Sequence, residues 1–255
     1  MRIMSYNILE GGIGRLDPLY EVIAAENPDV VLIQETWETP AFEKLAVKLN
    51  MDMFQAQSEK NPRGHVGVLS RYPILRGINY GPLENRLTRA AAMVTIQSPG
   101  CTMAFLCVHL HPYPTPEDEV IRLTEVQAVL AVAADSCRDA DMCIIGGDFN
   151  SIHPDQTVHT AALDPNNLAR ITAAGGNIRR DVISAMLAAS WIDAHACRRV
   201  PAQFDTTFTT AFPAMRVDYL FVPASGAQRV ADCRVVKSPM ARFASDHYPV
   251  VLELN

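Results

Sequence analysis

The sequence predicts a mixed α/β (or α+β) sandwich in which helices pack on β-sheets, and three observations lead to this prediction. Apolar runs typical of strands alternate with helical patterns in the first part of the chain. Strand patterns dominate the middle and the end, where neighbouring runs are joined by short turns and can pair antiparallel. No linker, internal repeat or shift in composition divides the sequence, so we expect one domain over residues 1–255.

The individual elements follow from hydrophobic spacing and turn residues. Strands are expected where a short apolar run ends in a turn or a polar residue, which gives residues 2–9, 30–35, 65–70, 90–97, 102–110, 142–145, 216–223 and 247–254. Helices are expected where apolar residues recur every three or four positions, which gives residues 15–27, 40–50, 117–134 and 181–189. The buried stripe of the third helix should consist of Val120, Leu123, Val126, Leu130 and Ala131. We expect residues 151–177 to be mostly loop.

Composition and charge exclude several classes of protein. With 49% hydrophobic residues the chain can build a large core, yet no apolar run is long enough to cross a bilayer. The first residues lack the basic region and apolar stretch of a signal peptide, so we expect a cytoplasmic location. We also expect a monomer. A formal net charge of −6 argues against tight, non-specific binding to duplex DNA, which requires many Lys and Arg contacts to phosphate.

Two smaller features complete the composition. The six cysteines are scattered without a C-x-x-C pair, which predicts free thiols in a reducing compartment. The arginine doublets at 179–180 and 198–199 are expected to be solvated surface.

Residues 144–153, IIGGDFNSIH, are the most informative stretch of the chain. An apolar run ends in two glycines and then presents Asp148 and Asn150. Residues two positions apart on a strand point to the same side, so the carboxylate and the carboxamide share one space. This arrangement suits an activated water molecule, with Asp148 accepting its proton and Asn150 fixing its direction.

Other apolar runs also end in a conspicuous polar side chain. These side chains are Asn7, Glu35, His109, Asp218, Asp246 and His247. A carboxylate buried at a strand end is costly unless it is paired or binds a cation. Glu35 and Asp246 are the oxygen ligands that Mg²⁺ or Mn²⁺ prefers, with Asn7 as a neutral third oxygen.

His247 is a candidate for phosphate binding or acid–base chemistry, and Asp218 is one candidate to orient its ring. His247 can donate a hydrogen bond to a phosphoryl oxygen or act as an acid–base group. Asp218 could orient the His247 ring, or it could pair with Arg216 on the same strand face for purely structural reasons. A cation together with a positioned water would give hydrolysis without a covalent intermediate.

Six motifs occur in the order SYN, IQET, VHLH, GDFN, RVDYLFV and SDH, between residues 5 and 247. In this order and spacing the chain resembles the endonuclease/exonuclease/phosphatase superfamily, whose members have the deoxyribonuclease I-like fold. The resemblance implies a four-layer sandwich, with two packed mixed β-sheets flanked by helices.

The same resemblance implies roles for individual side chains. Glu35 would coordinate the metal, with Asn7 and Asp246 close to the same cation. Asp148 would position or deprotonate the attacking water with the help of Asn150. The remaining implied roles are a His247–Asp218 pair and a phosphate contact from His109.

Two further side chains are candidates for substrate contact. Arg89, in NRLTRAAAMV, stands where many superfamily members carry an arginine, and it could bind phosphate or form a surface salt bridge. His111 shares a strand face with His109, although Pro112 ends the strand there.

Two departures from the similar AP endonucleases argue against cleavage at abasic sites. Leu9 stands where they carry an acidic residue, so one carboxylate of the metal site is missing. Their tryptophan-bearing segment before the RVDYLFV strand is short here and has no Trp over residues 208–215.

The sequence therefore predicts an enzyme, a divalent-metal-dependent hydrolase of phosphoester bonds. A small phosphoester, a lipid headgroup or a nucleotide is favoured as substrate over duplex DNA. A nuclease acting on DNA or RNA is the alternative, and a phosphate-binding module without turnover is a weaker one, because Glu35, Asp148 and His247 are all present. Specificity should depend on the loops at 11–16, 112–119 and 151–177.

Overall fold

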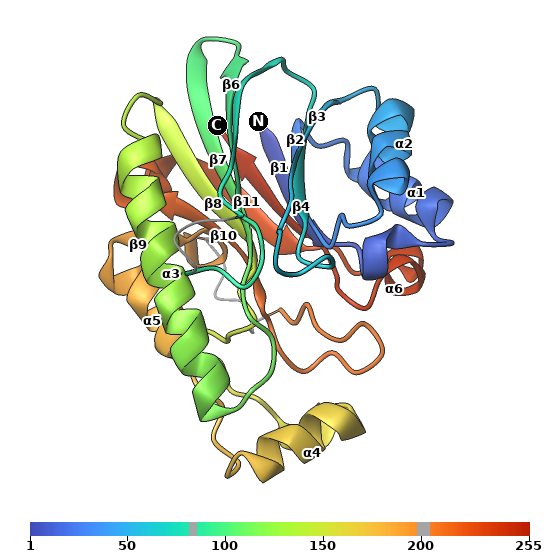
Figure 1. The fold of residues 1–255 in the computed structure, drawn as a ribbon, viewed down its shortest axis with the longest axis vertical. Coiled ribbons are helices and arrows are strands. Elements are labelled where there is room, and N and C mark those ends of the chain that lie inside the picture. Colours follow the sequence, from blue (N-terminus) through green and yellow to red (C-terminus); the bar gives the residue numbers. More distant parts are fainter. Residues whose placement is uncertain (82–85, 198–204) are drawn as a thin grey trace.

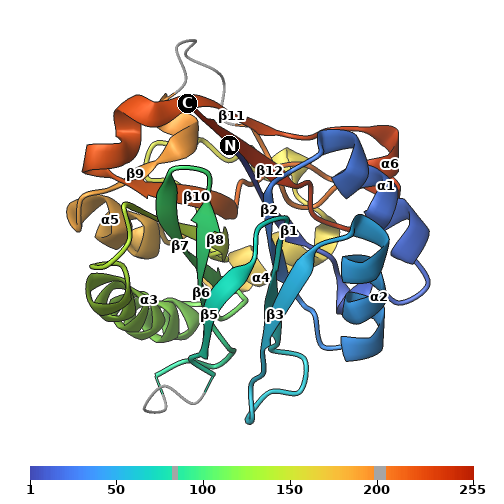
Figure 2. The same ribbon diagram turned by 90° about the horizontal axis from the view of Figure 1, so that it is seen from above.

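Two mixed β-sheets packed face to face form the centre of the molecule (Figures 1 and 2). The computed structural model describes residues 1–81, 86–197 and 205–255, and each sheet has six strands within these residues. The first sheet has the order β11-β12-β1-β2-β4-β3 and consists of β1 (Arg2–Asn7), β2 (Val30–Gln34), β3 (Asp52–Ala56), β4 (Val66–Ser70), β11 (Val230–Val235) and β12 (Val250–Leu254). In this sheet β1 and β2 run parallel, and the other neighbours are antiparallel.

The second sheet repeats this pattern, with one parallel pair among antiparallel neighbours. It has the order β5-β6-β7-β8-β10-β9 and consists of β5 (Ile74–Asn79), β6 (Ala92–Ser98), β7 (Cys101–His109), β8 (Met142–Asp148), β9 (Trp191–Asp193) and β10 (Asp218–Pro223). The parallel pair is β7 and β8, and a long helix connects them.

Helices cover both outer faces and complete a four-layer sandwich. The first sheet is covered by α1 (Leu16–Glu26), α2 (Thr39–Leu49) and α6 (Pro239–Ala244), and the second by α3 (Pro116–Ser136) and α5 (Asp181–Ala188) (Figure 2). The helix α4 (Pro165–Ala173) lies at one end of the sandwich (Figure 1). Short 3-10 turns occur at Glu10–Gly12, Thr160–Ala162, Ala194–Cys197 and Ala224–Arg229.

Strand alternation explains the layers. In β1, Ile3 belongs to the core between the two sheets, whereas Met4 belongs to the core beneath α1 and α2. The matching layer on the other side joins the second sheet to α3 and α5. The predicted four-layer fold is confirmed.

The helix α3 buries a different face from the one that the sequence predicts. Val120 is 65% exposed, and Ala131 is also exposed, whereas Glu119, Arg122 and Glu125 are buried. The expected apolar stripe is therefore wrong at two of its positions. The reason is that these charged side chains have partners outside the helix, which spacing along one helix cannot reveal. Glu119 and Glu125 accept from backbone N–H groups of other segments, and Arg122 donates to the His111 carbonyl oxygen and pairs with Glu119.

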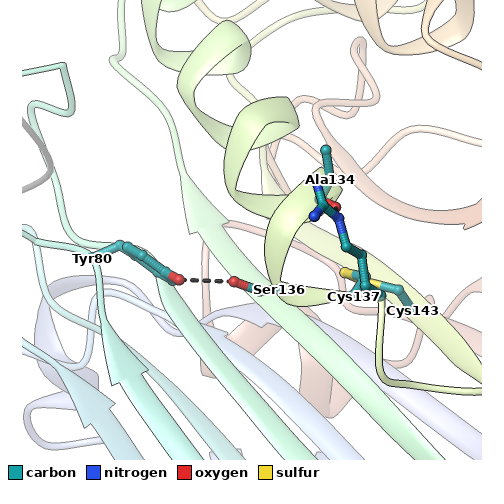
Figure 3. The surroundings of a disulfide bond; sticks show 6 residues. Tyr80, Ala134, Ser136, Cys137 and Cys143 are labelled. Atoms are coloured by element: carbon teal, nitrogen blue, oxygen red, sulfur yellow. Dashed lines mark hydrogen bonds between the residues drawn. A yellow bond between two sulfur atoms is a disulfide. The ribbon is translucent and has the colours of Figure 1, made fainter.

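Two of the six cysteines correct the prediction of free thiols. Cys137 and Cys143 form a disulfide that links the end of α3 to the start of β8, with a Cα–Cα distance of 5.6 Å (Figure 3). This distance lies in the usual range for disulfides, about 4.4–6.8 Å. Nearby, the Tyr80 and Ser136 hydroxyls are 2.8 Å apart and fix the same end of α3 to the sheet.

The arginine doublets differ from expectation at one position. Arg179 is exposed, but Arg180 is half-buried, and its guanidinium donates to the carbonyl oxygens of His153 and Gln156 at 2.7 Å each. Residues 198–199 lie outside the described residues. None of the helices described here is long and apolar enough to span a membrane.

Candidate active site

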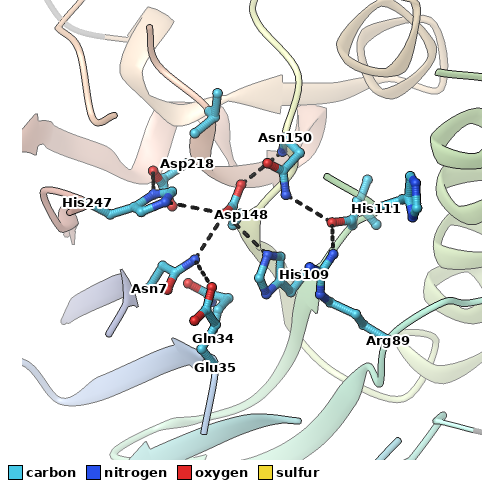
Figure 4. Close-up of polar contacts among 12 residues, drawn as sticks. Asn7, Gln34, Glu35, Arg89, His109, His111, Asp148, Asn150, Asp218 and His247 are labelled. Carbon is cyan, nitrogen blue, oxygen red and sulfur yellow. Dashed lines mark hydrogen bonds and ion pairs between the residues drawn. The ribbon is translucent and has the colours of Figure 1, made fainter. Parts of the chain in front are cut away.

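Strand pairing brings the polar strand ends together at one end of the sandwich. In the second sheet, Asp148 at the end of β8 lies beside His109 on β7 and beside Asp218 on β10. In the first sheet, Asn7 at the end of β1 lies beside Gln34 at the end of β2, and Glu35 follows Gln34 directly. Because the two sheets pack face to face, both sets of side chains reach the same space (Figure 4).

The two glycines of the GGDFN motif allow β8 to lie this close to its neighbours. A Cβ atom on Gly147 would lie 1.9 Å from the Val108 carbonyl oxygen, and its φ of 149° suits only glycine. A Cβ atom on Gly146 would lie 2.5 Å from Leu220 and 2.7 Å from Leu32, which comes from the other sheet. Any larger residue at these positions would move Asp148.

Several residues at the site have left-handed backbone conformations that are uncommon outside glycine. The φ angles are 47° at Asn150, 64° at Glu35, 52° at Leu9 and 46° at Glu10. Such conformations are costly, and they concentrate where side chains must be aimed for function. Here they turn the chain immediately after β1, β2 and β8.

Asp148 is the centre of the cluster (Figure 4). One of its carboxylate oxygens accepts a hydrogen bond from the Asn150 backbone N–H at 2.9 Å. The other accepts one from Asn7 Nδ2 at 3.1 Å and lies 3.4 Å from His109 Nε2 and 3.7 Å from His247 Nε2. Asp148 is 1% exposed, so these contacts replace the hydrogen bonds that its carboxylate would otherwise form with water.

The Asn150 side chain is fixed by the backbone at the end of β7. Asn150 Nδ2 donates to the Leu110 carbonyl oxygen at 2.9 Å, and Arg89 Nη1 donates to the same oxygen at 2.7 Å. Arg89 is therefore held beside Asn150 and close to His109 (Figure 4).

The His247 ring is held by Asp218. His247 Nδ1 and Asp218 Oδ2 are 2.9 Å apart, and both side chains are buried. The Phe208 ring lies against the imidazole, with 4.6 Å between the ring centroids. The structural alternative for Asp218 is wrong, because Arg216 pairs with Asp193 at 2.6 Å instead.

Burial and neighbouring charges separate the pKa values of the three central groups. Burial, together with the Asp218 charge, raises the pKa of Asp148 to about 7. Burial opposes the charged form of His247, but the Asp218 and Asp148 carboxylates outweigh it and raise its pKa well above the usual value. Burial and the nearby Arg89 charge lower the pKa of His109, which is therefore neutral. A carboxylate that titrates near neutral pH next to a protonated imidazole suits acid–base chemistry.

Two groups of side chains could hold a cation. Asp148, Asp218 and His247 offer ligand atoms within 4.8 Å of one another, but these atoms are engaged in the contacts described above. Asp246 is different, because its buried Oδ1 has no hydrogen-bond partner among the described residues. Burial is the main cause that raises the pKa of Asp246, and the nearby Glu35 charge adds to it. An orphaned carboxylate oxygen beside a second carboxylate is the arrangement that a hard cation satisfies.

Glu35 and Asn7 are oriented by hydrogen bonds next to Asp246. Glu35 Oε1 accepts from Asn7 Nδ2 at 3.2 Å, and Glu35 Oε2 accepts from the Glu10 backbone N–H at 2.6 Å. Asn7 Oδ1 accepts from the Leu9 N–H at 3.0 Å. In this orientation Asn7 fixes the Glu35 carboxylate and links it to Asp148 (Figure 4).

His111 stands apart from the other sequence-predicted residues. Its Nε2 lies 2.9 Å from Asp118 Oδ1 at the start of α3, and its backbone N–H donates to Glu125. In Figure 4 the ring points away from Asp148. Substrate contact by His111 stays a prediction, while the other nine candidate residues lie in or beside the cluster.

Sequence reasoning missed two residues that support the His247–Asp218 pair. The Thr207 hydroxyl accepts hydrogen bonds from the backbone N–H groups of Val217 and Asp218 at 3.1 and 3.3 Å. Phe208 forms an isolated bridge with His247 in addition to the ring contact. Both lie in a segment without periodicity, where only the tertiary fold brings them to the site.

The sequence matches the model of the endonuclease/exonuclease/phosphatase family over residues 4–247. The chain belongs to this family. It is therefore a phosphoester hydrolase, and the prediction of an enzyme of this family is confirmed. The sequence has no significant match among curated proteins.

Solved structures with the same fold are similar to the chain at low sequence identity. A 3'-5' exonuclease from Neisseria meningitidis has a TM-score of 0.71 at 19% identity, covering 100% of both chains. An AP endonuclease from Archaeoglobus fulgidus has a TM-score of 0.73 at 17% identity, covering 100% of this chain and 99% of that chain. A family protein from Leptotrichia buccalis has a TM-score of 0.71 at 17% identity, with the same coverage.

Proposed function

We propose that the protein hydrolyses phosphoester bonds by direct attack of a water molecule activated by Asp148, in a reaction that depends on a divalent cation. The observation that carries this proposal is the geometry of Asp148, whose carboxylate is fixed by Asn150 and Asn7 while facing His109 and His247. A buried carboxylate held by donors on two sides and facing two imidazoles is prepared for proton transfer rather than for folding.

The chain's own residues account for the proton and for the direction of attack. Asp148 accepts one proton from the water as the water oxygen bonds to phosphorus. The bond from phosphorus to the leaving oxygen breaks, and the leaving oxygen departs with the electron pair as an alkoxide that takes a proton from solvent. Asn150 orients the water, and protonated His247, held by Asp218, donates a hydrogen bond to a phosphoryl oxygen. Arg89 and His109 contact the phosphate from the side of β7.

Glu35 and Asp246 would bind Mg²⁺ or Mn²⁺, with Asn7 holding Glu35 in place. The fit rests on the unpartnered Asp246 oxygen and on the oxygen-only character of this donor set. When bound, the cation supplies Lewis-acid polarisation of the phosphate and offsets the charge that develops during displacement.

A pocket beside the cluster favours a small or neutral group on the phosphate. It has a cavity volume of about 70 Å³ and opens next to Asn150 and Phe208. It is lined otherwise by Tyr113, Pro114, Arg122, Ser151, Ile152, Asn167, Ile171, Ile178, Arg179, Met215 and Val217. These lining residues include two arginines and no carboxylate. We therefore favour a small phosphoester, an uncharged lipid headgroup or a nucleotide as substrate over an ester with a cationic headgroup such as choline.

The alternative is a nuclease acting on DNA or RNA, and two observations favour it as second candidate. The structural neighbours include a 3'-5' exonuclease and an AP endonuclease. Arg179 is exposed at the rim of the pocket, and Arg170 stacks over the Tyr113 ring at 4.8 Å beside Glu117 and Asp118, so two guanidinium groups lie near the pocket in an acidic chain.

We also propose that the protein is a monomeric, single-domain enzyme of the cytoplasm. A binding module that has lost turnover is the third candidate, and it is disfavoured because Glu35, Asp148 and His247 lie together with their hydrogen-bonding partners.

The test is a substrate panel assayed with Mg²⁺, with Mn²⁺ and with EDTA. The panel contains phosphomonoesters, phosphodiesters, lipid headgroup esters, single-stranded and duplex DNA, and RNA. We expect turnover of a small phosphoester with either metal and none with EDTA, and Glu35→Gln should raise the metal concentration required for half-maximal rate. Full turnover by metal-free protein would contradict the metal assignment, and preferential turnover of DNA or RNA would favour the nuclease.

A further inference from the structure

A buried carboxylate on α3 lies outside the cluster but holds two segments that enter it. Glu125 is 1% exposed and accepts three hydrogen bonds. One oxygen accepts from the Thr88 backbone N–H at 2.8 Å and from the Thr88 hydroxyl at 2.6 Å. The other oxygen accepts from the His111 backbone N–H at 2.7 Å. Both carboxylate oxygens are therefore used, one for each segment.

Each of these segments carries a residue of the candidate active site. Thr88 directly precedes Arg89, and His111 directly follows Leu110. The Leu110 carbonyl oxygen accepts hydrogen bonds from both Arg89 and Asn150, and the Leu110 N–H donates to the Asp148 carbonyl oxygen at 2.9 Å. Glu125 thus holds the chain on both sides of the contact that joins Arg89 to Asn150.

Stability alone gives no reason for a carboxylate at this position. The neighbouring buried residues Val126 and Val129 on α3 fix the helix to the sheet by apolar packing. Burying a charged group is costly, and an apolar residue of similar volume often serves stability equally well. What an apolar residue cannot do is hold two backbone segments at a fixed separation through three directed hydrogen bonds.

We propose that Glu125 is a positioning residue for the hydrolytic reaction, which acts by setting the position of Arg89 relative to Asn150. This inference rests on the proposed function of the cluster. Glu125 touches neither substrate nor the reacting atoms. Its carboxylate fixes the register between the segment before β6 and the end of β7, so that Arg89 and the water-orienting Asn150 converge on the same phosphate.

The test compares Glu125→Gln with Val129→Ala, a variant one turn further along the same helix that leaves a small cavity. In Glu125→Gln one acceptor oxygen becomes an NH₂ group that faces a donor, so one of the two segments is released. We expect kcat/KM to fall about 10- to 100-fold in Glu125→Gln, because a misplacement of about 1 Å costs about that much. Val129→Ala should lower Tm and leave kcat/KM within about twofold.

A double-mutant cycle identifies the route of the effect. If Glu125 acts through Arg89, Glu125→Gln should change kcat/KM by less than about twofold when Arg89 is already Ala. Thr88→Val, which removes only the hydroxyl donor, is the second variant if Glu125→Gln does not fold, and it should lower kcat/KM with the same dependence on Arg89.

Three results would overturn the inference. The first is a normal kcat/KM in folded Glu125→Gln. The second is a normal kcat/KM in Thr88→Val when Glu125→Gln does not fold. The third is a decrease in kcat/KM caused by Glu125→Gln, or by Thr88→Val in its place, that is as large in the Arg89→Ala background as in wild type. Asp148→Asn, measured in parallel, separates this failure from failure of the proposed function. If Asp148→Asn is inactive while Glu125→Gln is normal, only the positioning role is wrong. If Asp148→Asn turns over normally, the proposed function itself is wrong.

Discussion

Two buried ion pairs lie close together around β10, and they differ in how completely the oxygens of their carboxylates are used. Asp193 binds Arg216 through both carboxylate oxygens, at 3.2 and 2.6 Å, and also accepts from the His195 backbone N–H at 3.1 Å. Asp218 binds His247 through Oδ2 alone, and its buried Oδ1 has no hydrogen-bond partner among the described residues. Both oxygens of the Asp193 carboxylate are therefore used, whereas the Asp218 carboxylate leaves one acceptor oxygen unused.

The difference indicates which of two similar charge pairs serves chemistry. A buried pair whose oxygens are all satisfied has no capacity left for a substrate or a proton in transit. The Asp218–His247 pair faces a third titratable group, Asp148, whose pKa burial and the Asp218 charge raise to about 7. Strongly perturbed, interacting groups at an incompletely satisfied site are typical of catalysis.

Among variants of these two pairs, the largest effect on rate is expected from His247. His247→Ala removes the hydrogen-bond donor of the second pair and should lower kcat about 10² to 10⁴-fold, the usual effect of losing a positioned acid–base group. The variant should remain folded, as judged by circular dichroism and thermal unfolding. A kcat near wild type on the best substrate would remove His247 from the mechanism.

A smaller effect is expected when the partner of His247 is neutralised. Asp218 raises the His247 pKa by stabilising the imidazolium, so Asp218→Asn should lower that pKa. Because the protonated ring is the active form, the alkaline limb of the pH–rate profile should move to lower pH. We expect kcat to fall about 10- to 100-fold, less than for loss of the ring itself. An unmoved alkaline limb would show that Asp218 does not act through His247.

The smallest effect on rate, and the largest on stability, is expected at the other pair. Asp193→Asn leaves Arg216 buried without its full counter-charge and should destabilise the fold by about 3–5 kcal/mol. The protein that remains folded at low temperature should keep a kcat within about twofold of wild type, because Asp193 is absent from the Asp148 cluster. A loss of kcat equal to that of Asp218→Asn, with an unchanged Tm, would reverse the assignment of the two pairs.

The residues at strand ends could be predicted from the sequence, but not their partners. Asn7, Glu35, Asp148 and His247 each follow or begin an apolar run, and strand ends meet at one edge of a sheet. The sequence could not decide whether Asp218 pairs with Arg216 or with His247. The deciding contact is the ion pair between Arg216 and Asp193, which lies in another segment of the chain.

The elements that were missed share weak hydrophobic patterns. The edge strand β5 is largely exposed and the edge strand β3 is mostly half-buried, so neither shows a clear alternation of apolar and polar residues. The helix α4 buries only Ile171 and was expected to be loop. The carboxylate of Glu125 was unpredictable for a different reason, since its three donors lie 14 to 37 residues away along the chain.

Asp148→Asn tests most directly the central claim that the buried charges of this cluster serve hydrolysis at the expense of folding. A raised carboxyl pKa means that ionised Asp148 destabilises the folded state, and this destabilisation grows as pH rises from the unfolded pKa, about 4, towards the folded value. In EDTA at pH 8, Asp148→Asn should therefore match or exceed the wild-type Tm, and its advantage should shrink towards pH 4. In the presence of Mg²⁺ its kcat should fall about 10² to 10⁴-fold. A variant that loses Tm at pH 8 yet keeps wild-type kcat would contradict the account.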